Sequence, residues 1–187
     1  MLTKPQYGWT HIQFPNITLR ASYLTDVPND CLDSFIYALQ NNSPVVICFD
    51  AEGYDYHLVL SYYRSYIIVD KEDNSVDTYI IEKGIIELAM ELMNDIEDNF
   101  EDWLNWECDD DDIGEYTETN REVFKVKLSM LKFELNKRIC ELMRNNQCYI
   151  GNEDEFYLGE DNYWRFNGEW CCDYYNPEAD CCRPREK

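Results

Sequence analysis

Apolar and polar residues alternate along the first part of the chain, as is typical of β-strands. Residues 9–14 and 17–23 both alternate, and Pro15-Asn16 separates them. The segment 25–30, Thr-Asp-Val-Pro-Asn-Asp, has the residue types of a helix start. Apolar residues then recur at helical spacing up to about residue 41, which predicts one short helix. These residues are Leu32, Phe35, Ile36 and Leu39.

Four runs of β-branched and aromatic residues follow and predict an antiparallel meander. They span residues 45–50, 56–62, 66–70 and 76–81. A four-residue turn after the first run would set Asp50 opposite Asp55. The open face would then carry Val46, Cys48, Asp50, Asp55, His57 and Val59, with Cys48 opposite His57. The other face is clearly apolar, which predicts a sheet with one covered and one open face.

Two longer stretches show the spacing of amphipathic helices, at about residues 84–106 and 118–144. Joined by residues 107–117, they are expected to form an antiparallel pair. The predicted fold class is therefore α+β, with an antiparallel β-meander packed against a long antiparallel helical pair and one short helix. We assign residues 1–147 to this domain. From Cys148 the composition turns to Gly, Asn, Asp, Trp, Tyr and Cys, so residues 148–187 are expected to form a small appendage packed on the same domain.

The chain of 187 residues has a formal net charge of −22. Nucleic acids and anionic membranes are bound through Lys and Arg, so this charge opposes direct binding to either. It favours solubility and attraction to basic proteins. No apolar run reaches the ~18 residues of a membrane span, and the start of the chain does not resemble a signal peptide. We expect a cytoplasmic protein whose nine cysteines are mostly thiols.

The negative charge is concentrated, because no basic residue lies between Lys83 and Arg121. Five acids in the first long helix follow steps of three or four residues and are expected to form one ridge: Glu87, Glu91, Asp95, Asp98 and Asp102. The loop after it contributes Asp109, Asp110, Asp111 and Asp112. Like charges at this spacing cost stability, and no lysine compensates them within the helix. The pattern predicts a binding surface for a basic partner. Trp106 and Tyr116 are the candidate aromatic anchors.

The alternative interpretation of this acidic stretch is a solvated face that the basic residues of the second long helix partly neutralise. A calcium site is not predicted, because a loop started at Asp109 has Ile113 and Asn120 where ligands are needed. The tail leaves three states open: a zinc site, a disulfide or free thiols. Its cysteines are Cys148, Cys171, Cys172, Cys181 and Cys182. We expect no cofactor and no assigned metal site.

Catalysis has little support in the sequence. Cys48 and His57 could form a thiolate–imidazolium pair, but no neighbour supplies an obvious oxyanion hole. A P-loop and a Gly-x-Gly-x-x-Gly motif are both absent from the sequence. We therefore predict that the protein is not an enzyme.

The chain resembles small bacterial immunity proteins in two places. These are the segment from Tyr23 to Asp30, and the segment from Phe49 to Gly53 followed by His57 to Leu60. Such proteins neutralise polymorphic or contact-dependent toxins by binding them directly. The resemblance covers residues 17–106, and the Cys-rich end departs from it. It implies a cytoplasmic inhibitor whose acidic surface covers a basic toxin, often a nuclease.

The predicted function is thus that of an immunity or inhibitor protein that neutralises a basic protein toxin through an acidic surface. One alternative is a phage or mobile-element protein that mimics nucleic acid, presenting carboxylates instead of phosphates to a DNA- or RNA-binding protein. Another is a structural zinc-binding or cysteine-dependent protein. The sequence does not indicate an oligomeric state.

Overall fold

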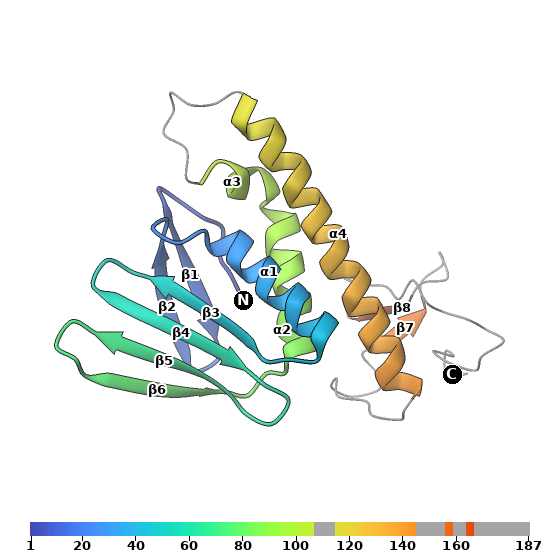
Figure 1. Cartoon of the computed structure of the whole chain (residues 1–187), viewed down its shortest axis with the longest axis horizontal. Helices are drawn as coiled ribbons and strands as arrows, with labels where there is room; N and C mark the ends of the chain where they lie inside the picture. The colour runs from blue at the N-terminus through green and yellow to red at the C-terminus, as the bar shows by residue number, and fades with distance from the viewer. Residues whose placement is uncertain (107–114, 145–155, 159–163, 167–187) are drawn as a thin grey trace. The chain divides into compact units, whose positions relative to one another are not determined.

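The computed structural model describes residues 1–106, 115–144, 156–158 and 164–166 (Figure 1). The chain divides into two compact units, Met1–Leu131 and Lys132–Lys187. The predicted boundary at residues 147–148 lies outside the described part. In the second unit, β7 (Phe156–Leu158) and β8 (Trp164–Phe166) pair antiparallel. Helix α4 (Glu115–Arg144) begins in the first unit and ends in the second.

The first unit has the predicted α+β character. Its four-stranded antiparallel sheet has the strand order β3-β4-β5-β6, which confirms the meander. The strands are β3 (Val45–Asp50), β4 (Tyr54–Leu60), β5 (Ser65–Lys71) and β6 (Val76–Ile81). The register also agrees with the prediction, since Asp50 lies opposite Asp55 and Cys48 opposite His57.

Strand β4 begins two residues earlier than the sequence indicated. The Ala51 N–H donates to the Tyr54 carbonyl at 2.9 Å and closes the turn. Between them Glu52 and Gly53 have positive φ angles of 54° and 122°. Glycine adopts this conformation easily, so the chain reverses within a short turn and pairing starts at Tyr54.

One face of the sheet is buried by a separate hairpin of β1 (Trp9–Phe14) and β2 (Ile17–Ser22). The Asn16 side chain donates to the Ile80 carbonyl at 2.7 Å, and the Ser22 hydroxyl donates to the Asp50 carbonyl at 3.1 Å. Because these contacts reach β6 and β3, the hairpin crosses the sheet from one edge strand to the other (Figure 1). Ile12, Ile47 and Leu58 are among the buried side chains of this core.

Helix α1 (Val27–Asn41) is the predicted short helix. Asp26 caps its first turn by accepting a hydrogen bond from the Asn29 N–H at 3.3 Å. Asn42, with a left-handed φ of 52°, ends it. The Ser34 hydroxyl donates to the Val46 carbonyl at 3.1 Å, which fixes the helix beside β3.

The prediction of one continuous helix over residues 84–106 is wrong. The segment forms α2 (Ile85–Asp98) and α3 (Phe100–Leu104), separated at Asn99, which has φ −122° and ψ 30°. The Asn99 side chain donates to the Asp95 carbonyl at 2.9 Å. An asparagine side chain that bonds to the backbone in this way replaces a helical hydrogen bond and favours a break. Helix α4 begins three residues before its predicted start. Across the described residues, no helix combines the length and the apolar character that crossing a membrane would require.

Candidate interaction surface

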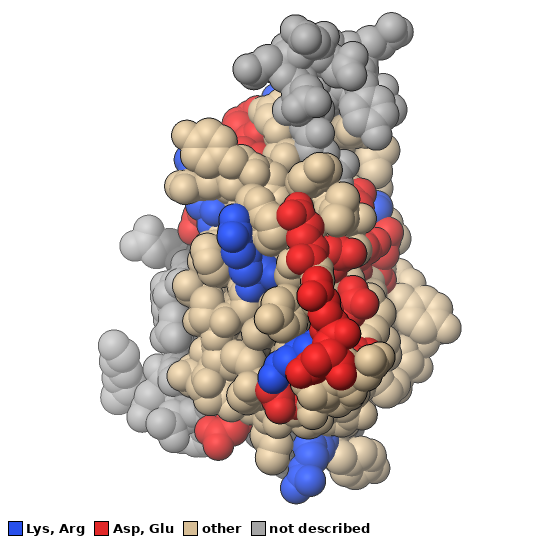
Figure 2. Space-filling model, turned by 90° about the vertical axis from the view of Figure 1, so that its left-hand side faces the viewer, with Lys and Arg blue, Asp and Glu red and all other residues tan. Residues whose placement is uncertain are grey.

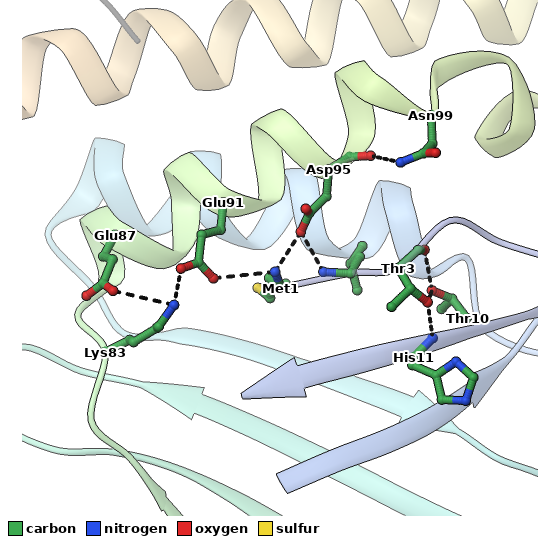
Figure 3. Close-up of polar contacts among 10 residues, drawn as sticks. Met1, Thr3, Thr10, His11, Lys83, Glu87, Glu91, Asp95 and Asn99 are labelled. Atoms are coloured by element: carbon green, nitrogen blue, oxygen red, sulfur yellow. Dashed lines mark hydrogen bonds and ion pairs between the residues drawn. The ribbon is translucent and has the colours of Figure 1, made fainter. Parts of the chain in front are cut away.

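The five acids of the predicted ridge lie on α2 and α3, and four of them pair with a cation. Figure 3 shows the contacts of Glu87, Glu91 and Asp95. Glu87 lies 3.5 Å from the Lys83 ammonium, and Asp102 lies 2.9 Å from that of Lys4. Asp98, the last residue of α2, is exposed and forms no ion pair with a described residue. The five acids share three cations, so the predicted ridge is partly neutralised within the chain.

Asp95 anchors the start of the chain to α2. Its Oδ2 atom accepts hydrogen bonds from the Met1 ammonium at 2.6 Å and from the Leu2 N–H at 2.7 Å. The Met1 side chain is fully buried, and Leu2 is bridged to Ile12 of β1. Burial raises the pKa of Asp95, while the ammonium and the Leu2 N–H act in the opposite direction. This carboxylate thus joins the hairpin to the helix.

Glu91 lies between two cations. One carboxylate oxygen contacts Lys83, and the other lies 3.4 Å from the Met1 ammonium (Figure 3). Partial burial acts to lower the pKa of Lys83, but the hydrogen bond and charge of Glu91, together with Glu87, raise it overall. Lys83 precedes α2 and so stabilises carboxylates in the first turns of the helix.

A further acid on α3 pairs with α4. The Arg121 guanidinium donates to Glu101 at 2.7 Å from Nη2 and lies 5.9 Å from the centre of the Phe100 ring. The Arg121 hydrogen bond lowers the pKa of Glu101. Phe100 also packs against Phe124 of α4, with ring centres 5.7 Å apart. Basic α4 therefore neutralises part of the acidic segment, as the alternative interpretation predicted.

The aromatic anchors proposed from the sequence are not exposed where the structure describes them. Trp106 is only 8% exposed, because apolar burial takes it into the core, and its ring packs edge-to-face with that of Trp103 at a centre-to-centre distance of 5.4 Å. Tyr116 lies on α4, and its side chain is outside the described part, as are all atoms of Asp109, Asp110, Asp111 and Asp112.

The open face of the four-stranded sheet, which the predicted register already defines, is a second candidate surface. The pairing aligns its side chains in three rows across the strands. The apolar row is Val46, Val59, Tyr66 and Ile80. The central row is Cys48, His57, Ile68 and Thr78. The acidic row is Asp50, Asp55 and Asp70, followed by Val76 on β6.

The open face is more apolar than a solvated face normally is. Antiparallel sheets with one covered face usually present polar side chains to water. Here Val46 is 56% exposed, Ile80 52% and Val76 57%. A group of exposed apolar side chains on one surface is typical of a binding site, whereas single ones are ordinary.

The acidic row places three carboxylates on neighbouring strands. Asp50 is opposite Asp55, and Asp55 is opposite Asp70, across strands spaced roughly 4.8 Å apart. None of the three forms an ion pair with a described residue. Lys71, the nearest lysine in the sequence, is instead held by Asp77 at 2.5 Å.

The turns beside this row add further negative charge. A Cβ atom built on Gly53 would lie 2.5 Å from a carboxylate oxygen of Glu72, so Glu72 lies against the β3–β4 turn. Figure 2 views the molecule from the side on which the β3–β4 and β5–β6 turns lie in Figure 1, and a band of acidic side chains crosses this face. Asp50, Asp55, Asp70 and Glu72 therefore lie together at the turn end of the sheet.

The central row contains the predicted cysteine–histidine contact. Cys48 Sγ lies 3.1 Å from His57 Nδ1, and Cys48 is an exposed free thiol. Cys31 is a second free thiol, and complete burial raises its pKa well above the usual range. Within the described residues, no group of His, Cys, Asp and Glu is arranged to hold a metal ion. The tail cysteines considered for zinc lie outside them.

No protein-family model, curated protein or solved structure matches this chain.

Replacing Asp95 tests its structural role. Asp95→Asn leaves the Met1 ammonium without its nearest countercharge, so the free energy of unfolding should fall by about 1–3 kcal/mol. Asp98→Asn is the matched control on the same helix. Because Asp98 is exposed at the C-terminal end of α2, its replacement should change stability by less than about 0.5 kcal/mol. Urea unfolding measures both. Equal effects of the two substitutions would contradict the assigned role of Asp95.

Proposed function

We propose that this protein binds a basic protein partner and neutralises it, in the manner of a cytoplasmic immunity or inhibitor protein. The observation that carries the proposal is the acidic row of Asp50, Asp55 and Asp70, which has no ion pair among the described residues in a chain of net charge −22. A cationic partner would supply the missing countercharges.

The stability cost of the acidic row supports this proposal. Like charges directly opposite each other on neighbouring strands are destabilising. Lysines at the facing positions would remove that cost, yet the row consists of aspartates on three successive strands. Asp50 also accepts a hydrogen bond from the Glu52 N–H at 2.7 Å in the β3–β4 turn, so the charge that folding does not explain is that of Asp55 and Asp70. The same charge would also accelerate encounter with a basic protein.

Because Glu91 and Asp95 of α2 already pair with cations of the same chain, we propose that the partner contacts the sheet and not this helix. A partner that bound Glu91 or Asp95 directly would have to displace Lys83 or the Met1 ammonium. The acidic row needs no such exchange. We therefore assign Glu91 and Asp95 to the fold, while the exposed Asp98 adds to the general negative field.

The apolar row favours an inhibitor over a nucleic-acid mimic. Interfaces with nucleic acid are more polar than those between proteins. A surface that copied DNA or RNA would gain little from exposed Val46 and Ile80. A protein partner with apolar and basic side chains could use both parts of the face.

Capture experiments test the proposed function. The baits are the wild-type chain, a variant carrying Asp50→Asn, Asp55→Asn and Asp70→Asn, and a control carrying Glu82→Gln, Glu97→Gln and Asp98→Asn. Both variants lose the same charge, and the three control positions are exposed. The wild type and control should retain a basic protein in about 50 mM salt and release it in about 500 mM salt, because salt screens exposed charges.

The acidic-row variant should retain at least tenfold less of that protein, since tenfold corresponds to about 1.4 kcal/mol. The purified partner should lose its own activity on addition of one equivalent of the wild-type chain. Retention of no basic protein, or equal retention by both variants, would contradict the proposal.

A stability measurement checks the acidic row independently of any partner. Asp55→Asn removes a charge that faces Asp50 on one side and Asp70 on the other. We expect the free energy of unfolding to rise by about 0.2–1 kcal/mol. The gain should shrink at high salt, where repulsion in the wild type is screened. A loss of stability on this substitution would show that Asp55 supports the fold.

A further inference from the structure

The open face of the four-stranded sheet is apolar at one end of its strands and acidic at the other. We propose that it binds its partner in one orientation along the strands. The occupant is a cationic protein segment that places apolar side chains on the apolar row and Lys or Arg side chains over the acidic row. This inference rests on the proposed function, because it specifies the partner of the same surface.

The spacing of the rows defines the segment that would fit. Successive rows are two residues apart along each strand, so the acidic row lies roughly 14 Å from the apolar row. An extended segment of about five residues spans that distance. Its cationic end would lie near the β3–β4 and β5–β6 turns, where Glu72 adds a further carboxylate.

Charge complementarity selects this occupant over a second copy of the chain. Two copies stacked face to face would set their acidic rows against each other or against the partner's apolar row. The first arrangement brings like charges together, and the second removes carboxylates from water without a cation. Each copy also carries a net charge of −22. A purely apolar ligand would likewise leave Asp55 and Asp70 without countercharges.

His57 in the central row can report whether a peptide is bound on the open face. His57 lies between the apolar and acidic rows, next to Cys48 on one side and Ile68 on the other. The chain has only one other histidine, His11, which is exposed on β1 of the separate hairpin. The ring-proton NMR signals of His57 and His11 therefore distinguish binding on this face from binding elsewhere.

The test titrates the full chain with two synthetic peptides of identical composition. The block peptide has Ile, Val and Tyr followed by Lys and Arg, and in the second peptide the same residues alternate. The block peptide should shift the His57 signal in a saturable way and leave His11 unchanged. The alternating peptide should bind about tenfold more weakly, because it cannot place all its apolar side chains on the apolar row and all its cationic side chains on the acidic row.

Two surface variants separate the contributions of the rows. Asp55→Asn with Asp70→Asn should weaken the block peptide and reduce its salt dependence. Val46→Thr with Ile80→Thr should weaken it at all salt concentrations, and both positions are exposed enough for the fold to tolerate the change. Both variants should reduce the preference for the block peptide.

Equal binding of the two peptides, no shift of His57, or equal shifts of His57 and His11 would overturn the directional proposal. So would full binding by the Val46→Thr, Ile80→Thr variant. If that variant binds fully while the aspartate variant does not, an acidic binding site remains and only the directional inference fails. Failure of the proposed function is recognised separately, when capture yields no salt-sensitive basic protein.

Discussion

The structure has to accommodate 38 acidic side chains with only 16 lysines and arginines. Mutual repulsion among carboxylates opposes a compact state, so the placement of the few cations largely decides which acids support the fold. Lys83, Lys4, Arg121 and the Met1 ammonium are all placed against acids of α2 or α3. The acidic row on the sheet has no described cation. We therefore expect the paired acids to support the fold and the repulsion within the acidic row to oppose it.

The contact between Asp95 and the start of the chain links two parts of the first unit. Through Met1 and Leu2 it connects α2 to the strand pairing of β1, and the hairpin in turn covers the four-stranded sheet. Once the hairpin covers one face, alternation along the strands leaves the other face open. The position of the candidate surface therefore depends on contacts on the far side of the sheet.

Much of the sheet could be predicted because strand alternation has a short period and only one face is covered. The register that sets Asp50 against Asp55 and Cys48 against His57 follows from that pattern. The helix break at Asn99 could not be predicted, because apolar residues continue at helical spacing across it and the hydrogen bond that decides the break is local. Pairing of Met1 with Asp95, 94 residues apart, has no sequence signal. The prediction that Trp106 is exposed is wrong, because it relied on the acidic residues near it in the sequence. The functional hypothesis of an immunity protein came from the sequence alone, and no protein-family model, curated protein or solved structure matches the chain.

The division of the acids into structural and exposed sets can be measured without substitution or partner. Carbodiimide coupling of glycine ethyl ester to carboxylates, followed by peptide mass spectrometry, reports the reactivity of each acid in the folded chain. Asp55 and Asp70, which are exposed, should be modified several-fold faster than Asp95, whose carboxylate is bound to Met1 and Leu2, and unfolding in urea should abolish the difference. Equal rates for Asp55 and Asp95 in the folded chain would contradict the division on which the proposed function rests.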